Sequence, residues 1–110
     1  MPAGHADHVP YPVFRAALER GDLTRIRRLA ASMPPIRLDD ALRICLLMRD
    51  HEDYERAAVR WLGRFALEGG DVDLEAIAEA AAAFDALPLQ PDAAMERLAA
   101  VCVRCGVMTS

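Results

Sequence analysis

The stretch VCVRCG, residues 101–106, holds the two residues whose types and spacing most suggest chemistry. Cys102 and Cys105 are three positions apart, a spacing found in redox pairs and in zinc sites. A redox pair needs its first thiol at the N-terminus of a helix, where the helix dipole lowers the thiol pKa, whereas these cysteines fall at a predicted C-terminal end. A structural zinc site needs four ligands, and the sequence has no second pair at matching spacing. We therefore predict buried, unreactive cysteines, no metal and no other cofactor.

Histidines offer two other places for a metal ion. His5 and His8 form an H-x-x-H pair, but residues 1–10 contain glycine, proline and little that could pack, which favours a flexible tail. His51 and Glu55 would face the same way on a helix and could seat a metal-dependent enzyme site. The acids around His51 are equally explained by the helix dipole, which favours negative charge in a first turn.

The motifs of nucleophilic and phosphate chemistry are missing from the sequence. It contains no Gly-x-Ser-x-Gly turn and no glycine-rich phosphate loop. We therefore predict that the protein is not an enzyme. A metal-dependent enzyme at His51 and Glu55 is kept as an alternative, which bound metal in the purified protein would support.

The composition is that of one globular domain. The chain has 110 residues, which is enough for one continuous core and too few for two domains of ordinary size. Of these residues, 54% are hydrophobic and 27% are charged, which is in the range of globular proteins. The longest apolar runs, 44–48 and 80–84, are far shorter than the roughly 20 residues that span a bilayer. Residues 1–10 have neither the basic start nor the apolar stretch of a secretion signal, so we expect a cytoplasmic protein.

Charge is distributed unevenly along the chain. Residues 1–64 hold eleven arginines against nine acids, and residues 65–110 hold two arginines against eight acids. The net charge therefore changes from +2 to −6 between the two parts. Because the pI is near 5.3 and no basic patch is rich in aromatic residues, nucleic acid is not the expected main partner.

Hydrophobic periodicity predicts six helices and no strand. The clearest apolar face lies within residues 53–70 and contains Tyr54, Ala57, Ala58, Trp61, Leu62 and Phe65. Other residues predict the helix boundaries: Asp22, Asp73 and Pro91 at starts, and Gly21, Pro34, Gly69 and Gly106 at ends. We expect Trp61 and Phe65 to be buried between the second and third of three helical hairpins.

A similarity at an offset of 36 residues relates the helices to one another. It pairs Ala57 with Ala93, Ala58 with Ala94, Leu62 with Leu98, Gly70 with Gly106 and, as small core residues, Ala30 and Ala66 with Cys102. We infer a single domain, 11–110, built as an all-α solenoid of stacked antiparallel hairpins at about 11–34, 36–70 and 72–106. Unrelated amphipathic helices also align tolerably once phased, which is the alternative explanation of the similarity.

The period and the helix–turn–helix unit resemble tetratricopeptide-type repeats. The resemblance covers about residues 11–106 and implies a stacked architecture and a role in binding proteins or peptides. It implies no particular binding residues, because that family's small, aromatic and proline positions are poorly matched in this sequence.

Four arginines form the surface feature that most suggests a function. Arg28 and Arg64 occupy equivalent repeat positions, and Arg56, Arg60 and Arg64 are spaced four residues apart on one helix. Stacked second helices would align them as a basic ridge on which an acidic partner segment could dock. A solvated face paired with nearby acids is the other explanation. We predict a small protein-interaction or scaffold module, with a nucleic-acid-associated regulator that uses the ridge as the alternative.

The two ends of the predicted stack lack covering elements. A repeat stack exposes an apolar face at each end unless a capping element covers it. Tyr11, Val13 and Phe14 lie at one end, and Val103 and Val107 lie at the other. We predict a homodimer formed through the last hairpin, whose alanines allow close helix approach. The acidic charge of that hairpin, which would face itself, opposes this arrangement.

Overall fold

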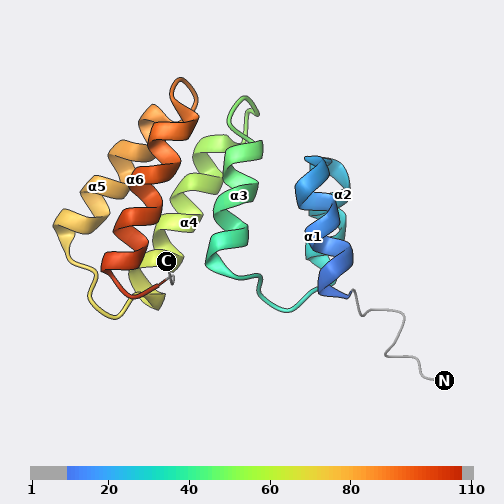
Figure 1. Cartoon of the computed structure of the whole chain (residues 1–110), viewed down its shortest axis with the longest axis horizontal. Helices are drawn as coiled ribbons and strands as arrows, with labels where there is room; N and C mark the ends of the chain where they lie inside the picture. Colours follow the sequence, from blue (N-terminus) through green and yellow to red (C-terminus); the bar gives the residue numbers. More distant parts are fainter. Residues whose placement is uncertain (1–9, 108–110) are drawn as a thin grey trace.

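Six helices make up residues 10–107, the part of the chain that the computed structural model describes (Figure 1). They are α1 (Tyr11–Arg20), α2 (Leu23–Ala31), α3 (Leu38–Leu47), α4 (Tyr54–Glu68), α5 (Leu74–Ala86) and α6 (Pro91–Arg104). Successive helices pair into the hairpins α1–α2, α3–α4 and α5–α6, which follow one another along the molecule. The predicted all-α fold of stacked hairpins is thereby confirmed.

Two sequence predictions concern the chain beyond these helices and its relation to membranes. The predicted tail with His5 and His8 falls, except for Pro10, in residues 1–9, which lie outside the described residues. Within residues 10–107, no helix combines the length and the apolar character needed to cross a membrane.

Capping residues fix where several helices begin and end, as predicted. Asp22 and Asp73 accept hydrogen bonds from the backbone N–H groups of Arg25 and Ala76, at 3.2 and 2.8 Å, at the starts of α2 and α5. Gly21 follows α1 with a φ of +70°, a left-handed conformation that residues with a Cβ rarely adopt. Because of this sharp turn, α2 begins directly after Asp22 and packs back against α1.

Helices α3 to α6 enclose the main core, and Trp61 of α4 joins three of them. Its ring stacks on Phe65 and meets the edge of Phe84 on α5, with ring centroids 5.3 Å apart in both cases. Its indole N–H donates a 2.9 Å hydrogen bond to the carbonyl oxygen of Leu38, at the start of α3. Trp61 and Phe65 are 2% and 0% exposed, so their predicted burial between the second and third hairpins is confirmed.

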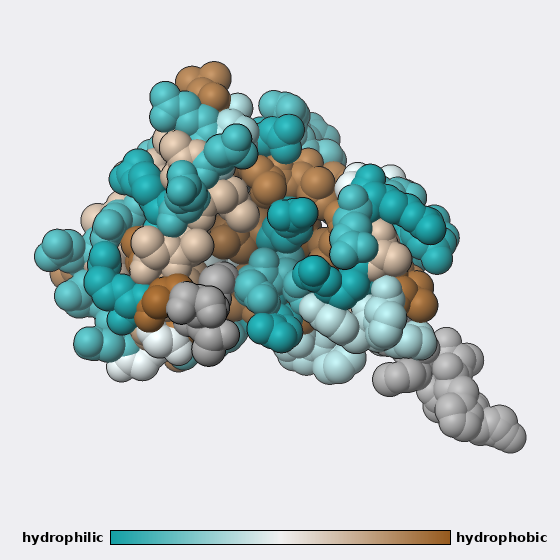
Figure 2. Space-filling model, in the orientation of Figure 1, coloured by the Kyte–Doolittle hydropathy of each residue, from teal (hydrophilic) through white to brown (hydrophobic). Residues whose placement is uncertain are grey.

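The first hairpin has a small core of its own. Its fully buried residues are Phe14, Ala17, Leu18 and Ile26. From α3, Ile44 and Leu47 pack against this cluster and are only partly buried. Figure 1 shows the hairpin at one end of the molecule, and Figure 2 shows apolar side chains in the seam beside it, flanked by polar ones. The first hairpin is therefore attached to the other helices mainly through α3.

A buried acid also fastens the first hairpin to α3. Asp40, in the first turn of α3, is 2% exposed and accepts hydrogen bonds from the Tyr11 hydroxyl at 2.7 Å and from the Arg15 guanidinium at 3.1 Å. Both donors belong to α1, and the hydrogen bond to Asp40 raises the pKa of each of them. Since α2 is paired with α1, these contacts also determine where α2 lies relative to α3.

Replacing Asp40 with asparagine is expected to weaken this attachment. The amide keeps the size of the carboxylate but loses its charge, so the hydrogen bond from Tyr11 weakens and the free energy of unfolding falls by about 1–2 kcal/mol. Urea denaturation measures the change. In a double-mutant cycle with Tyr11→Phe, the combined cost should be smaller than the sum of the single costs, and strict additivity would contradict the contact.

Burial shows where the 36-residue similarity holds. Ala58 and Ala94 are both buried, as their pairing requires. Ala66, however, is exposed, whereas Cys102 is fully buried, so the prediction that they share a small core position is wrong at Ala66. On α4 it is the large ring of Phe65 that is buried in the core, and the next residue, Ala66, is turned to solvent.

The apolar ends on which a homodimer was predicted are smaller than the sequence suggests. Phe14 is fully buried within the first hairpin, and Val107 packs against the main core. Tyr11, Val13 and Val103 keep part of their surface exposed, at 42%, 38% and 41%. The homodimer through the last hairpin stays a prediction.

Candidate binding groove

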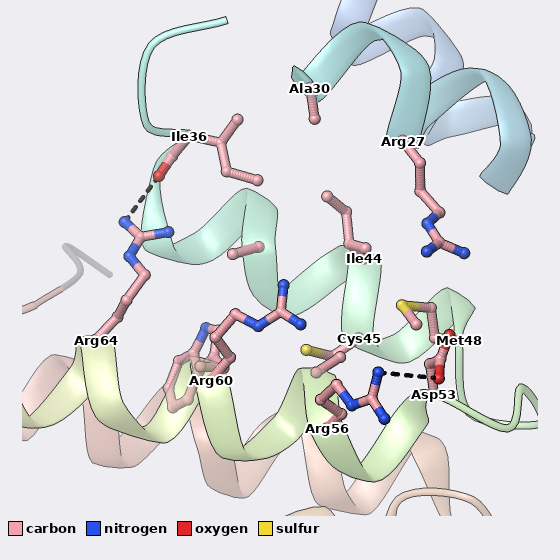
Figure 3. A pocket seen from close by; sticks show the side chains of 13 residues that line it. Arg27, Ala30, Ile36, Ile44, Cys45, Met48, Asp53, Arg56, Arg60 and Arg64 are labelled. Carbon is pink, nitrogen blue, oxygen red and sulfur yellow. Dashed lines mark hydrogen bonds and ion pairs between the residues drawn. The ribbon is translucent and has the colours of Figure 1, made fainter. Parts of the chain in front are cut away.

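A groove lies over α3, between the first hairpin and α4. It encloses about 380 Å³. Its lining residues are Arg27, Ala30, Ile36, Ala41, Ile44, Cys45, Met48, Asp53, Arg56, Ala57, Arg60, Trp61 and Arg64. Apolar side chains from α3 and from the segments beside it form the floor, while arginines of α2 and α4 border it on opposite sides (Figure 3). The groove therefore combines an apolar floor with four positive charges and a single acid, Asp53.

One of these arginines is part of the framework of the groove. Arg64 donates hydrogen bonds from Nε and Nη2 to the two carboxylate oxygens of Glu68, at 2.7 and 3.3 Å. Its Nη2 also donates to the carbonyl oxygen of Ile36 at 2.8 Å, which fixes the loop between α2 and α3 (Figure 3). Its charge is neutralised by Glu68, so Arg64 shapes the groove more than it attracts a ligand.

The other three arginines keep most of their capacity to bind an anion. Arg56 approaches Asp53 only to 3.9 Å and its side chain is 75% exposed, so this ion pair is weak. Arg27 and Arg60 make no ion pair with any residue in the range 10–107. A negatively charged group above the floor would meet arginines from two sides of the groove.

A second hollow lies beside the groove along α4. It shares Asp53, Arg56 and Arg60 and is further lined by Glu52, Glu55 and Val59. Its volume, about 530 Å³, exceeds that of the groove. However, its acids offset its arginines, and its lining has one apolar side chain. The groove over α3 is the better candidate because its arginines outnumber its one acid by four to one and its floor is apolar.

Three of the four arginines in the predicted ridge border the groove. Arg56, Arg60 and Arg64 lie along it on α4, whereas Arg28 is exposed on α2 but does not line it. Its neighbour Arg27, which the sequence analysis did not select, takes that place. One residue turns a helix by about 100°, so a one-residue error in aligning α2 with α4 selects the wrong side chain. Arg27 lies three residues before Ala30, a spacing that places both on the same face of α2, and this spacing could have indicated Arg27 from the sequence.

All three cysteines are buried, as predicted for Cys102 and Cys105. Burial, together with a smaller contribution from the nearby Cys105, raises the pKa of Cys102 to about 11. Cys45 lies in the floor of the groove, and burial raises its pKa to about 11 although the charge of Arg60 lowers it in part. At neutral pH these two thiols are therefore protonated.

The native protein is expected to resist thiol reagents. With a pKa of about 11, only about one in a thousand of the Cys45 and Cys102 thiols is ionised at pH 8, and all three buried sulfur atoms are hard to reach. Ellman's reagent at pH 8 should therefore label the native chain slowly and all three cysteines rapidly in denaturant. Rapid labelling of one or more thiols under native conditions would contradict the burial of the three cysteines.

The residues considered for metal binding have other surroundings. His51 accepts a 3.0 Å hydrogen bond at Nδ1 from the backbone N–H of Asp53, just before α4. Glu55 borders the second hollow. Within residues 10–107, no three or more His, Cys, Asp or Glu side chains are grouped so that they could hold a metal ion.

No protein-family model, curated protein or solved structure matches this chain. The chemistry of the groove is therefore the basis on which a function is proposed.

Proposed function

We propose that this protein is a non-enzymatic interaction module, a tetratricopeptide-like stack of helical hairpins whose groove binds an acidic segment of a protein partner. One observation carries the proposal: Arg27 and Arg60, which have no ion-pair partner among residues 10–107, face each other across an apolar floor. The floor favours apolar side chains because their burial removes them from water. The guanidinium groups favour carboxylates, which accept paired hydrogen bonds from them.

The size of the groove suits a short segment. Its volume of about 380 Å³ accommodates a few side chains and lies at the small end of ligand sites. An amphipathic helix or extended peptide can place two or three apolar side chains on such a floor while its acids reach the rim. The ligand class is therefore a peptide segment with leucine-like residues flanked by aspartate or glutamate.

A peptide is favoured over nucleic acid by the arrangement of charge. Nucleic-acid binding relies on many contacts to phosphates along a basic surface. Here the arginines border an apolar floor, Arg64 is neutralised by Glu68, and the whole chain has a net charge of −4. These features support the protein partner and give the nucleic-acid alternative no specific support.

A labelled synthetic helical peptide with leucines on one face and glutamates beside them tests the proposal. Fluorescence polarisation should detect its binding, and a matched peptide with glutamine for glutamate should bind about tenfold more weakly or worse, because the arginines lose their charged partners. Added salt should weaken the acidic peptide's binding through screening.

Two variants locate the binding site. Arg60→Glu reverses a charge at the groove and is expected to reduce affinity by about tenfold or more. Arg28→Glu makes the same change at an exposed position outside the groove and should leave affinity near wild type. Equal effects of the two variants, or tighter binding of a DNA or RNA oligonucleotide than of the peptide, would overturn the proposal.

A further inference from the structure

The start of α5 carries an exposed leucine among acids. Leu74 is 86% exposed, and Asp71, Asp73 and Glu75 beside it are exposed as well. We call these four residues the acidic knob. Asp71 and Glu75 make no ion pair within the described part of the chain, and Asp73 uses Oδ1 to cap α5. An apolar side chain flanked by the Asp71 and Glu75 carboxylates complements an apolar groove bordered by Arg27 and Arg60, which also make no ion pair in the described part of the chain.

Other exposed leucines lack this combination. Leu89 is 88% exposed but lies between proline and glutamine, with no acid adjacent to it. Leu67 is 87% exposed, and the acid next to it, Glu68, is already bound by Arg64. Close to the knob there is one arginine, Arg104, and it is paired with Glu79 at 2.6 Å. The knob therefore keeps its negative charge.

We infer that the acidic knob of one copy of this chain docks into the arginine-bordered groove of a second copy, an inference that rests on the proposed function of the groove. The start of α5 lies at the end of the molecule opposite the first hairpin (Figure 1). The groove is formed by α2, α3 and α4, so a copy cannot place its own knob in its own groove without unpacking α5 from α4. The contact joins two copies head to tail through different surfaces.

The distribution of charge favours this orientation. Residues 1–64 carry a net charge of +2 and residues 65–110 carry −6, so a head-to-tail contact brings opposite charges together. A two-fold contact through the last hairpin would instead bring acid against acid. Each added copy leaves one groove and one knob uncovered, so the association continues beyond a dimer or closes into a ring.

Two complementary variants test the contact. Arg56→Glu combined with Arg60→Glu blocks the groove and leaves the knob intact. Leu74→Arg blocks the knob and leaves the groove intact; because Leu74 is 86% exposed, folding should not change. Leu89→Arg is the matched control, with the same substitution at an equally exposed leucine. If circular dichroism shows that the double variant is misfolded, Arg27→Glu on α2 blocks the groove from its other side.

Light scattering over a range of protein concentrations gives the readout. For the wild type and Leu89→Arg, the average molecular mass should rise above the monomer mass of 12.1 kDa as the protein concentration increases. The rise should be smaller in high salt. Each blocked variant alone should remain a monomer, with association weakened by about tenfold or more. An equimolar mixture of the two blocked variants should form a complex of twice the monomer mass and nothing larger. The groove-blocked variant supplies the one intact knob, the knob-blocked variant supplies the one intact groove, and no further copy can add to the pair.

Several outcomes would overturn the inference: a wild type that stays monomeric, a mixture that stays monomeric, or a groove-blocked variant that still dimerises, as a two-fold contact through the last hairpin predicts. The peptide assay separates this inference from the proposed function. If Leu74→Arg and the wild type bind the acidic peptide equally and the wild type does not self-associate, the groove binds acidic segments and the partner is a different protein.

Discussion

The Trp61→Ala substitution is expected to lower the free energy of unfolding by about 3–5 kcal/mol. The substitution removes a ring that is 2% exposed, that stacks on Phe65 and that meets Phe84 edge-on. It also removes the hydrogen bond that the indole N–H donates to the carbonyl oxygen of Leu38. Small domains have a total stability of about 5–15 kcal/mol, so this loss leaves a marginal fold or none. Urea denaturation followed by circular dichroism measures it.

Two variants separate the contributions within that effect. Trp61→Phe keeps an aromatic ring in the core and loses the indole N–H, so its cost should be smaller than that of alanine. Leu67→Ala removes a large side chain from the same helix at a position that is 87% exposed, and should change stability by less than about 0.5 kcal/mol. A Trp61→Ala cost as small as that of Leu67→Ala would show that the ring does not join the hairpins.

Features encoded within one or two turns of helix could be predicted from the sequence. Asp22 and Asp73 cap helices because their carboxylates need only reach a backbone N–H three residues ahead. The burial of Trp61 and Phe65 follows from the period of the apolar face of α4. Local spacing was sufficient in these cases because each interaction partner, or the orientation of the face, is fixed by helical geometry.

Features that depend on how helices turn relative to one another could not be predicted in this way. Asp40 reads as an ordinary acid in a first turn, and only packing brings Tyr11, 29 residues away, against it. The choice of Arg27 over Arg28 depends on the rotation of α2 about its own axis, for which the repeat alignment gave the wrong residue. The groove also requires the position of the first hairpin, which no pattern within a single helix contains.

The attachment of that hairpin connects the fold to the proposed function. Arg27 and Ala30 belong to α2, so one side of the groove exists only while the first hairpin is packed against α3. It is held by the hydrogen bonds from Tyr11 and Arg15 to Asp40 and by the packing of the partly buried Ile44 and Leu47. Binding at the groove and docking of the hairpin should therefore stabilise each other, because a ligand that contacts α2 and α4 together binds only the docked form.

A Phe14→Ala variant is expected to unfold the first hairpin while α3 to α6 stay folded. Phe14 is fully buried and is the largest member of a four-residue core, so its loss costs about 3–5 kcal/mol within a unit that has little else to hold it. Helices as short as α1 and α2, of 10 and 9 residues, are unstable in water without packing. Circular dichroism should show about a quarter of the helical signal lost.

The remaining helices provide the control within the same molecule. Trp61 fluorescence should still report a cooperative unfolding of α3 to α6 in urea, because its partners Phe65, Phe84 and Leu38 all lie outside the first hairpin. The acidic peptide should bind much more weakly, since α2 no longer borders the groove. Val13→Ala, at a position on α1 that is 38% exposed, should retain both helix content and binding. A Phe14→Ala chain that keeps its full helical signal, or one that loses the cooperative transition of α3 to α6, would contradict the separate core of the first hairpin.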